Sequence, residues 1–370
     1  MRTALAATWT LLLGMALLML GAGLQGTLVG LRASLEGFPT LVSGFMLAAY
    51  YLGYMAGSMM TPGMVNTVGH VRVFAALTSV ASVLILLQGV FVAPLPWTLV
   101  RILFGFCFAG IYVVAESWLN GRVDNEHRGL LLSIYMLICY GGLGLGQLLL
   151  NVADPRSTLL FILVSVLISV AMVPMALTPA SAPEITVPVR VSPRNLFRRS
   201  PLGVAGVAVA GAVSGCLFSL GAIYADARGF STFEVSLFMA VAILAGCVMQ
   251  LPIGRISDRL DRRTVVIAVC VLAAICALGA WWLADISRLV YFTMIAAYGG
   301  TSLTLYSLSS AHVNDLVPDE EKLGASSTLI LVNGGGAFIA PILVAGVMEI
   351  AGNDTFLPLL AAMHVLLAVY

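Results

Sequence analysis

The sequence predicts an all-α integral membrane protein, with twelve transmembrane helices arranged as two six-helix bundles related by a pseudo-two-fold axis. Three observations predict this fold: a very apolar composition, a series of apolar runs of membrane-spanning length, and an internal repeat. Of the 370 residues, 60% are hydrophobic and 9% are charged, whereas a soluble domain is typically about half apolar and about a quarter charged. The net charge of +1 gives no indication of a nucleic-acid partner.

Apolar runs separated by polar or proline-containing gaps define the spans, since a helix needs roughly 20 apolar residues to cross a bilayer. The first run, from Trp9 to Leu31, is too long for a signal-peptide core and has no small-residue cleavage site, so we expect a retained span. The last run stops at Tyr370 after about 16 residues, so we expect its helix to be cut short. The twelve predicted spans cover roughly 8–31, 39–61, 72–93, 97–119, 129–152, 158–178, 201–224, 231–253, 264–284, 288–312, 324–348 and 355 to the end.

One long polar stretch, TPASAPEITVPVRVSPRNLFRRSP, divides the spans into six and six. Its prolines rule out a single continuous helix, because proline lacks the backbone N–H and clashes with the preceding turn. We therefore predict an N-terminal six-helix bundle over 1–178, a cytoplasmic linker over 179–200 and a C-terminal six-helix bundle over 201–370.

Basic residues predict the orientation, because cytoplasmic loops carry an excess of arginine and lysine. With a cytoplasmic N-terminus, four basic residues fall in outside loops, namely Arg32, Arg156, Arg228 and Arg288. Thirteen fall inside, namely Arg2, Arg72, Arg122, Arg128, Arg190, Arg194, Arg198, Arg199, Arg255, Arg259, Arg262, Arg263 and Lys322. This bias predicts a multi-pass protein of the bacterial inner membrane with its N-terminus in the cytoplasm.

The two halves repeat with an offset near 194 residues. Matched positions are Gly105 with Gly299, Tyr112 with Tyr306, Asn120 with Asn314, Val123 with Val317, Glu126 with Glu320, Arg128 with Lys322, Gly141 with Gly335 and Gly142 with Gly336. Eight pairs at one offset indicate a duplication, and parallel six-helix repeats of this kind are typical of transporters.

The stretch GRISDRLDRR, Gly254 to Arg263, concentrates charge in an otherwise apolar chain. It resembles the G-x-x-x-D-R-x-G-R-R loop of the major facilitator superfamily, with Asp261 in place of the second glycine. The equivalent loop between the second and third spans is PGMVNTVGHVR, where Asn66 replaces the acid and Gly69 is kept. The run RILFG, Arg101 to Gly105, resembles the superfamily's R-x-x-x-G pattern.

Two further stretches, AESWLNGRV and RRSPLGVAG, resemble a smaller bacterial branch of that superfamily. The branch contains YcaD-type transporters, copper importers and riboflavin importers. The resemblance covers the whole chain and implies a transporter that works by alternating access.

The resemblance also implies a gating role for this charged loop. The residues concerned are Gly254, Asp258, Arg259, Arg262 and Arg263, with Asn66 in the degenerate copy. A carboxylate at a helix C-terminus opposes the helix dipole and favours a neighbouring helix N-terminus. The alternative is a loop that only sets the topology, which explains the arginines but not Asp258.

The fourth span carries ionisable residues inside the membrane, which are functional candidates because their insertion is costly. Arg101, Tyr112 and Glu116 lie on one face when spaced at 100° per residue. We expect them to line a substrate cavity, with Glu116 a candidate for proton coupling. Alternatively, Arg101 and Glu116 extend their charged ends to the two interfaces.

Neutral polar residues near mid-span are further cavity candidates. They are Gln25 in the first span, Tyr50 and Tyr54 in the second, Gln147 in the fifth and Asn333 in the eleventh. Tyrosines normally lie at the interfaces, so their depth suits a cavity that binds a planar organic solute. Interhelical hydrogen bonds and simple packing are the alternative interpretations.

No cofactor or resident metal site is predicted. The six cysteines form no CxxC pair and are interpreted as small apolar residues. Soft thioether sulfurs suit Cu(I), which makes Met15, Met19, Met55 and Met59 weak copper candidates. Methionine is also a common core residue, and copper transport is not favoured here.

The predicted function is secondary active transport, not catalysis, because no acid/base pair, metal cluster or phosphate-binding loop is found. We expect import of a small organic molecule, driven by protons or by its own gradient. Multidrug or metabolite efflux by proton antiport, copper or riboflavin import, and a non-transporting sensor or assembly factor remain alternatives. The expected partners are a small-molecule or ion substrate, protons and membrane lipid, with the protein a monomer.

Overall fold

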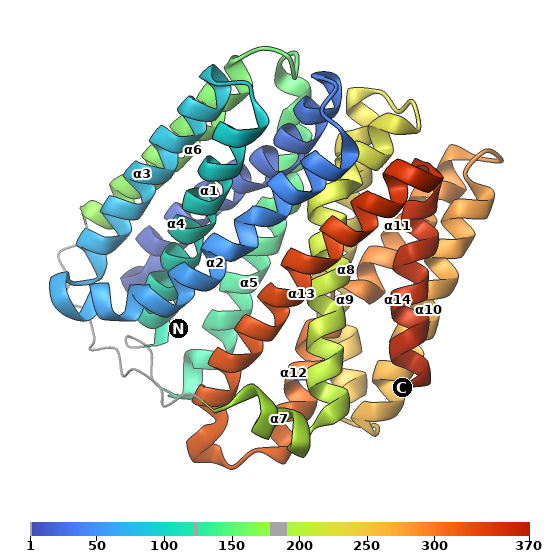
Figure 1. Cartoon of the computed structure of the whole chain (residues 1–370). Helices are drawn as coiled ribbons and strands as arrows, with labels where there is room; N and C mark the ends of the chain where they lie inside the picture. Colours follow the sequence, from blue (N-terminus) through green and yellow to red (C-terminus); the bar gives the residue numbers. More distant parts are fainter. Residues whose placement is uncertain (1, 121–124, 178–190) are drawn as a thin grey trace. The chain divides into compact units, whose positions relative to one another are not determined.

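The structure is a computed structural model, and it describes residues 2–120, 125–177 and 191–370 (Figure 1). The described residues are almost entirely helical. The long helices are α1 (Arg2–Leu35), α2 (Thr40–Val68), α3 (His70–Val90), α4 (Pro94–Asn120), α5 (Asn125–Leu148), α6 (Leu159–Ala176), α8 (Pro201–Ala227), α9 (Thr232–Ser257), α10 (Arg262–Leu283) and α13 (Lys322–Ala351). Shorter ones are α7 (Pro193–Arg199), α11 (Arg288–Ser302), α12 (Leu305–Leu316) and α14 (Phe356–Val369).

Each predicted span corresponds to one of these helices or to a consecutive pair. In the described part of the chain, nine helices are long and apolar enough to cross a membrane. The other three predicted spans are α2, the α11–α12 pair, and α14, which has 14 residues. The all-α membrane fold predicted from the sequence is therefore confirmed.

The predicted tenth span, 288–312, is wrong in one respect, because two helices replace the single one. Helix α11 ends at Ser302 and α12 begins at Leu305. The hydroxyl of Thr304 donates to the Thr301 carbonyl over 2.7 Å, and His364 of α14 contacts the Ser302 hydroxyl at 3.1 Å. Hydroxyl side chains that bond nearby backbone carbonyls compete with the regular helix ladder, which explains the break at this Ser/Thr-rich turn.

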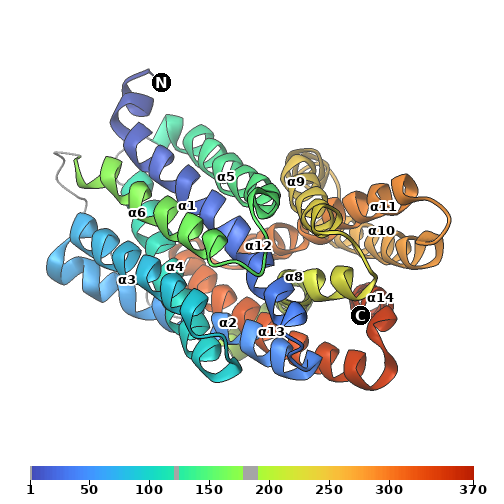
Figure 2. The same cartoon turned by 90° about the horizontal axis from the view of Figure 1, so that it is seen from above.

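The chain forms two compact units by internal contacts. One unit comprises Met1–Val29 and Ala49–Val187, and the other comprises Gly30–Ala48 and Pro188–Tyr370. In the first unit α3 packs against α4 and α6, and in the second α10 packs against α11 and α14 (Figure 2). Within the predicted linker, α7 begins with proline at its first turn, where the missing N–H costs nothing. The remaining linker residues 179–190, together with residue 178, Arg122 and Val123, lie outside the described residues.

The tip of the α1–α2 hairpin packs within the second unit. The Ser34 hydroxyl donates to the Asp226 carboxylate over 2.5 Å. The backbone N–H of Leu41, in the first turn of α2, donates to the Glu349 carboxylate over 2.6 Å. A carboxylate at a helix N-terminus compensates both the helix dipole and an unsatisfied N–H group, so this contact stabilises the start of α2.

Repeat-matched glycines mark the helix crossings of both units. In the first unit, a Cβ atom at Gly105 of α4 would collide with the Tyr50 carbonyl of α2. In the second, a Cβ at Gly299 of α11 would collide with Ala242 of α9 in the same way. Small residues let helix backbones approach closely in a membrane, where packing rather than the hydrophobic effect holds helices together.

The other matched pairs divide into packed and open positions. Gly142 contacts the Met19 side chain, and Gly336 lies against the backbone of Ala208. In contrast, a Cβ at Gly141 or at Gly335 would meet no described atom within 4 Å. The duplication seen in the sequence is thus a duplication of packing geometry.

Candidate functional site

Arg101 and Gln25 form the centre of a buried polar cluster in the first unit. Arg101 of α4 has 6% of its surface exposed, and Gln25 of α1 has 2%. The arginine donates to the Gln25 side-chain oxygen over 3.0 Å. Its guanidinium carbon also lies 4.8 Å from the centre of the Tyr50 ring, in a cation–π contact. Arg101 is therefore turned inward among neutral polar and aromatic groups rather than extended to an interface.

Aromatic rings continue the cluster along α2 and α4. The Tyr50 ring centre lies 5.3 Å from that of Tyr51 and 5.9 Å from that of Tyr54. Tyr54 in turn lies 6.4 Å from Tyr112, whose hydroxyl donates to the Met19 sulfur over 3.0 Å. The geometry falls within the range of favourable aromatic pairs.

The local sequence explains why these side chains meet. Gly105 follows Arg101 by one helical turn and lies against the backbone of Tyr50 and Tyr54. Because this close crossing leaves almost no space between α2 and α4, the tyrosines of α2 are brought level with the arginine of α4. In the R-x-x-x-G pattern, the arginine therefore provides the charge, and the glycine allows the close helix crossing that brings the aromatic rings of α2 to it.

Gln147 and Asn333, two other predicted cavity residues, make interhelical hydrogen bonds. The Gln147 side-chain oxygen of α5 accepts from the Thr27 hydroxyl of α1, and its amide nitrogen donates to the Leu143 carbonyl over 3.2 Å. In the second unit, the Asn333 amide of α13 donates to the Val207 carbonyl of α8 over 3.3 Å. These contacts hold neighbouring helices together, which is the packing role weighed for polar residues in membranes.

Glu116 lies apart from this cluster on α4. Its side chain is exposed in the structure, and fifteen residues separate it from Arg101, or about 22 Å along the helix axis. The next residue, Ser117, contacts the His70 ring of α3 at 2.9 Å. Glu116 is thus on the same helix as the buried arginine but at a different depth.

The methionine candidates differ in burial. Met15 and Met19 are fully buried in α1, whereas Met59 of α2 is 44% exposed. The Met19 sulfur accepts the Tyr112 hydroxyl. Met15 and Met19 are therefore core residues of α1, as apolar packing requires.

Arg262 is the centre of the charged loop at the end of α9. It contacts the Asp315 carboxylate at the end of α12 at 2.5 Å, Asp258 at 3.2 Å and the Ser257 hydroxyl at 3.2 Å. Asp258 is the C-cap of α9, where its charge opposes the helix dipole. The arginine compensates that charge and joins the ends of α9, α10 and α12.

Asp261 has a different role in the same loop. It is the N-cap of α10, and its side chain accepts from the backbone and hydroxyl of Thr264 at 3.3 and 3.1 Å. These hydrogen bonds favour the charged form and hold the pKa of Asp261 below its usual value. The acid that replaces the second glycine of the pattern therefore starts a helix. Arg255, Arg259 and Arg263 are exposed.

The degenerate loop between α2 and α3 keeps the turn but not the acid. Gly69 has a φ of 90°, a conformation that side-chain-bearing residues rarely adopt. Asn66 is exposed near the end of α2. The positive φ at this position therefore explains why the loop keeps a glycine here.

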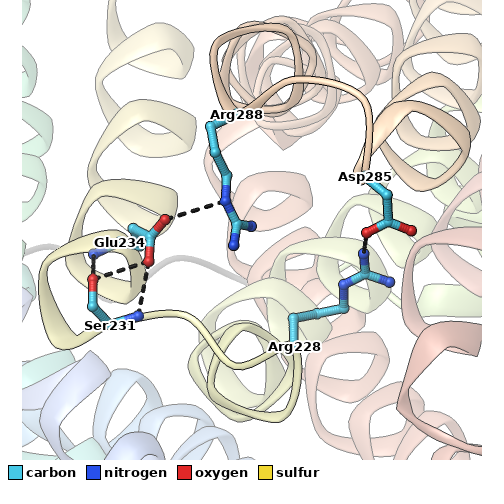
Figure 3. Close-up of polar contacts among 5 residues, drawn as sticks. All are labelled: Arg228, Ser231, Glu234, Asp285 and Arg288. Carbon is cyan, nitrogen blue, oxygen red and sulfur yellow. Dashed lines mark hydrogen bonds and ion pairs between the residues drawn. The ribbon is translucent and has the colours of Figure 1, made fainter.

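Ion pairs also lie at the other ends of α9 and α10, away from the charged loop. They join the α8–α9 connection to the α10–α11 connection, as Figure 3 shows. Arg228 contacts Asp285 at 2.9 Å and Asp354 at 2.8 Å. Arg288 contacts Glu234 at 3.3 Å, and Glu234 completes a capping box with Ser231 at the start of α9. Three connections, α8–α9, α10–α11 and the segment before α14, are joined by these contacts.

Several partners in these networks were not found from the sequence. Thr27, Asp315 and Asp354 are the main examples, and their partners lie 120, 53 and 126 residues away. No local pattern reports pairing at such separations. Ser231 with Glu234, in contrast, carries a readable local signal, the S-x-x-E capping box.

Comparisons with known proteins agree with this architecture. Residues 11–341 match the family model described as Major Facilitator Superfamily. The chain is 28% identical over 344 residues to the Uncharacterized MFS-type transporter YcaD of Escherichia fergusonii, covering 92% of this chain and 88% of the relative. It is also 28% identical over 346 residues to YcaD of Salmonella arizonae, with the same coverage.

Solved structures show the same fold at low sequence identity. The nucleoside transporter NupG aligns with a TM-score of 0.77 at 16% identity, covering 97% of both chains. A bacterial homologue of the human lysosomal transporter Spinster, in its inward-facing and occupied conformation, aligns with a TM-score of 0.76 at 15% identity, covering 98% of this chain and 95% of that one. The chain is a multi-pass membrane protein that belongs to the Major Facilitator Superfamily of transporters.

Proposed function

We propose that the protein imports a small organic molecule across the bacterial inner membrane by alternating access, with its N-terminus in the cytoplasm. The observation that carries this proposal is the Gln25–Arg101–Tyr50 cluster. A buried charge inside a membrane helix is costly and marks a substrate or ion pathway by default. The orientation follows from the excess of basic residues in the loops assigned to the cytoplasm.

The experiment is uptake into proteoliposomes with the purified full chain, using mixtures of labelled small metabolites. Solute uptake above the level of protein-free control liposomes supports the proposal. Accumulation only in inverted vesicles points to efflux. If no solute class moves in either orientation, the proposed transport function is overturned.

Glu116 is the proposed coupling residue, because it is the exposed carboxylate within α4. We expect Glu116→Gln to remove the dependence of uptake on a pH gradient, since the amide cannot exchange a proton with the solvent. Downhill exchange of solute should persist. The measurement is initial uptake rate with and without an imposed gradient.

Glu320→Gln is the matched control, because Glu320 is also exposed but lies in the segment before α13. It should keep full proton dependence. If Glu116→Gln retains proton-driven uptake, another group couples transport to protons.

Gly254, Asp258, Arg259, Arg262 and Arg263 are proposed to form a gate at the cytoplasmic end, with Asn66 in the weaker copy. Arg262 is central, since it contacts Asp258 and Asp315 on different helices. We expect Arg262→Gln to release the ends of α9 and α12 and to raise the accessibility of reporter cysteines at this end several-fold, since it removes two ion pairs that each contribute up to about 1 kcal/mol when exposed.

Arg255→Gln provides the control for this variant. Arg255 lies in the last turn of α9 and is exposed, so its loss should change accessibility little. Equal behaviour of the two variants would show that the loop only sets topology.

A further inference from the structure

The side chain of Gln25 is held in one orientation by Arg101. A guanidinium group can only donate hydrogen bonds, so the amide oxygen must be the atom that faces it. The distance from the Arg101 nitrogen to that oxygen is 3.0 Å. The amide nitrogen of Gln25 therefore points away from the arginine, and its two N–H groups need other acceptors.

No acceptor for this nitrogen is present among the described residues. The nitrogen is buried and makes no hydrogen bond there, although Gln25 as a whole is 2% exposed. Leaving a buried donor unsatisfied costs about 1–3 kcal/mol. A group that brings an acceptor to this position would recover that cost.

The adjoining groups favour an acceptor with negative charge. The Nε atom of Arg101 is a second buried donor in this cluster that makes no hydrogen bond among the described residues. A guanidinium presents its N–H groups as a planar fork that matches a carboxylate. One carboxylate can accept from both Arg101 and the Gln25 nitrogen.

The tyrosines define the remainder of the ligand. Tyr50, Tyr51, Tyr54 and Tyr112 are linked by ring-centre distances of 5.3 to 6.4 Å. All four tyrosines are only partly buried, so part of each ring remains accessible to a planar ligand that packs against it. A small planar ring attached to a carboxylate combines both requirements.

We propose that the transported solute is a planar organic carboxylate, whose anionic group is bound by Arg101 and by the side-chain nitrogen of Gln25. This inference rests on the proposed function, since it assigns the solute class of the same cluster. The alternative is that the two residues form a purely structural hydrogen bond between α1 and α4. A preference for negatively charged over neutral ligands distinguishes the binding role from the structural one.

The experiment compares acids with their neutral amides on the purified full chain. The probes are benzoate and indole-3-acetate, with benzamide and indole-3-acetamide as isosteric neutral partners. Binding is measured by calorimetry, together with the thermal shift that a ligand selective for the folded state produces. We expect both acids to bind at least about tenfold more tightly than their amides, which corresponds to one charge-assisted hydrogen bond.

Two variants of Gln25 test the donor itself. Gln25→Leu should weaken acid binding about tenfold and leave amide binding within about twofold. Gln25→Glu places a negative charge beside Arg101 and should abolish acid binding, so it tests the same point if the leucine variant does not fold. Gln88→Leu is the control, because Gln88 of α3 is also fully buried and its side chain makes no hydrogen bond among the described residues.

Three outcomes overturn the inference: no acid binds, acids and amides bind alike, or Gln25→Leu leaves the affinity for acids unchanged. Uptake of a neutral or cationic solute, with no preference for carboxylates, overturns the solute class and keeps the transport function. Failure of uptake for every solute overturns the function itself.

Discussion

Arg101→Gln is expected to weaken solute binding and uptake strongly while the protein still folds. The substitution removes a charged, forked donor, and a hydrogen bond to a charged group contributes about 1.5–3 kcal/mol. Affinity for an anionic solute should therefore fall about ten- to a hundredfold. Stability should change less, because burial of a guanidinium is itself costly and a neutral side chain removes that cost. Binding constants and melting temperatures measured on the same preparation separate the two effects.

Arg101→Lys and Arg72→Gln complete this experiment. Lysine keeps the charge but offers no planar fork, so it should restore part of the affinity. Arg72 is exposed in the first turn of α3, and its replacement should leave binding unchanged. Normal affinity in Arg101→Gln would assign the arginine to helix packing alone.

Gly105→Ala and Gly299→Ala are expected to destabilise the two units to a similar degree. Each adds one methyl group where α4 meets α2 or α11 meets α9, and the collision is with backbone, which cannot rotate away. Forcing extra atoms into a packed contact costs about 1–3 kcal/mol or more. The yield of folded protein and its melting temperature in detergent report the loss.

Gly141→Ala and Gly335→Ala are the matched controls from the same repeat. The added methyl would meet no described atom within 4 Å, and alanine favours a helix over glycine by about 1 kcal/mol. These variants should be as stable as the parent or more so. If all four alanine variants behave alike, the matched glycines do not reflect a repeated packing geometry.

The sequence predicted the helices better than the contacts of their polar residues. Arg101 was recognised as a candidate because a charge in an apolar run is rare. Gln25, Gln147 and Asn333 had the same status in the sequence, yet Gln25 contacts a cation, Gln147 a threonine and Asn333 a backbone carbonyl. Each contact depends on which face of a neighbouring helix comes opposite.

The charged loop shows the same division. Its density of charge was visible in GRISDRLDRR, but three of its charged residues have different roles in the structure. Asp261 caps α10, Asp258 pairs with Arg262, and Arg259 is exposed. The capping role follows from the threonine three residues later, whereas the role of Arg262 depends on Asp315, 53 residues away.

By itself the sequence determined that this is an all-α membrane protein with spans in two repeated halves, because bilayer thickness sets helix length and apolar runs report it locally. The tertiary structure decided which polar side chains meet: it broke the tenth span at Ser302 and brought Gln25 to Arg101 across 76 residues. The physical reason is that helix partners in a membrane are selected by close packing of small residues such as Gly105. Hydropathy carries no information about which neighbour a helix face will contact.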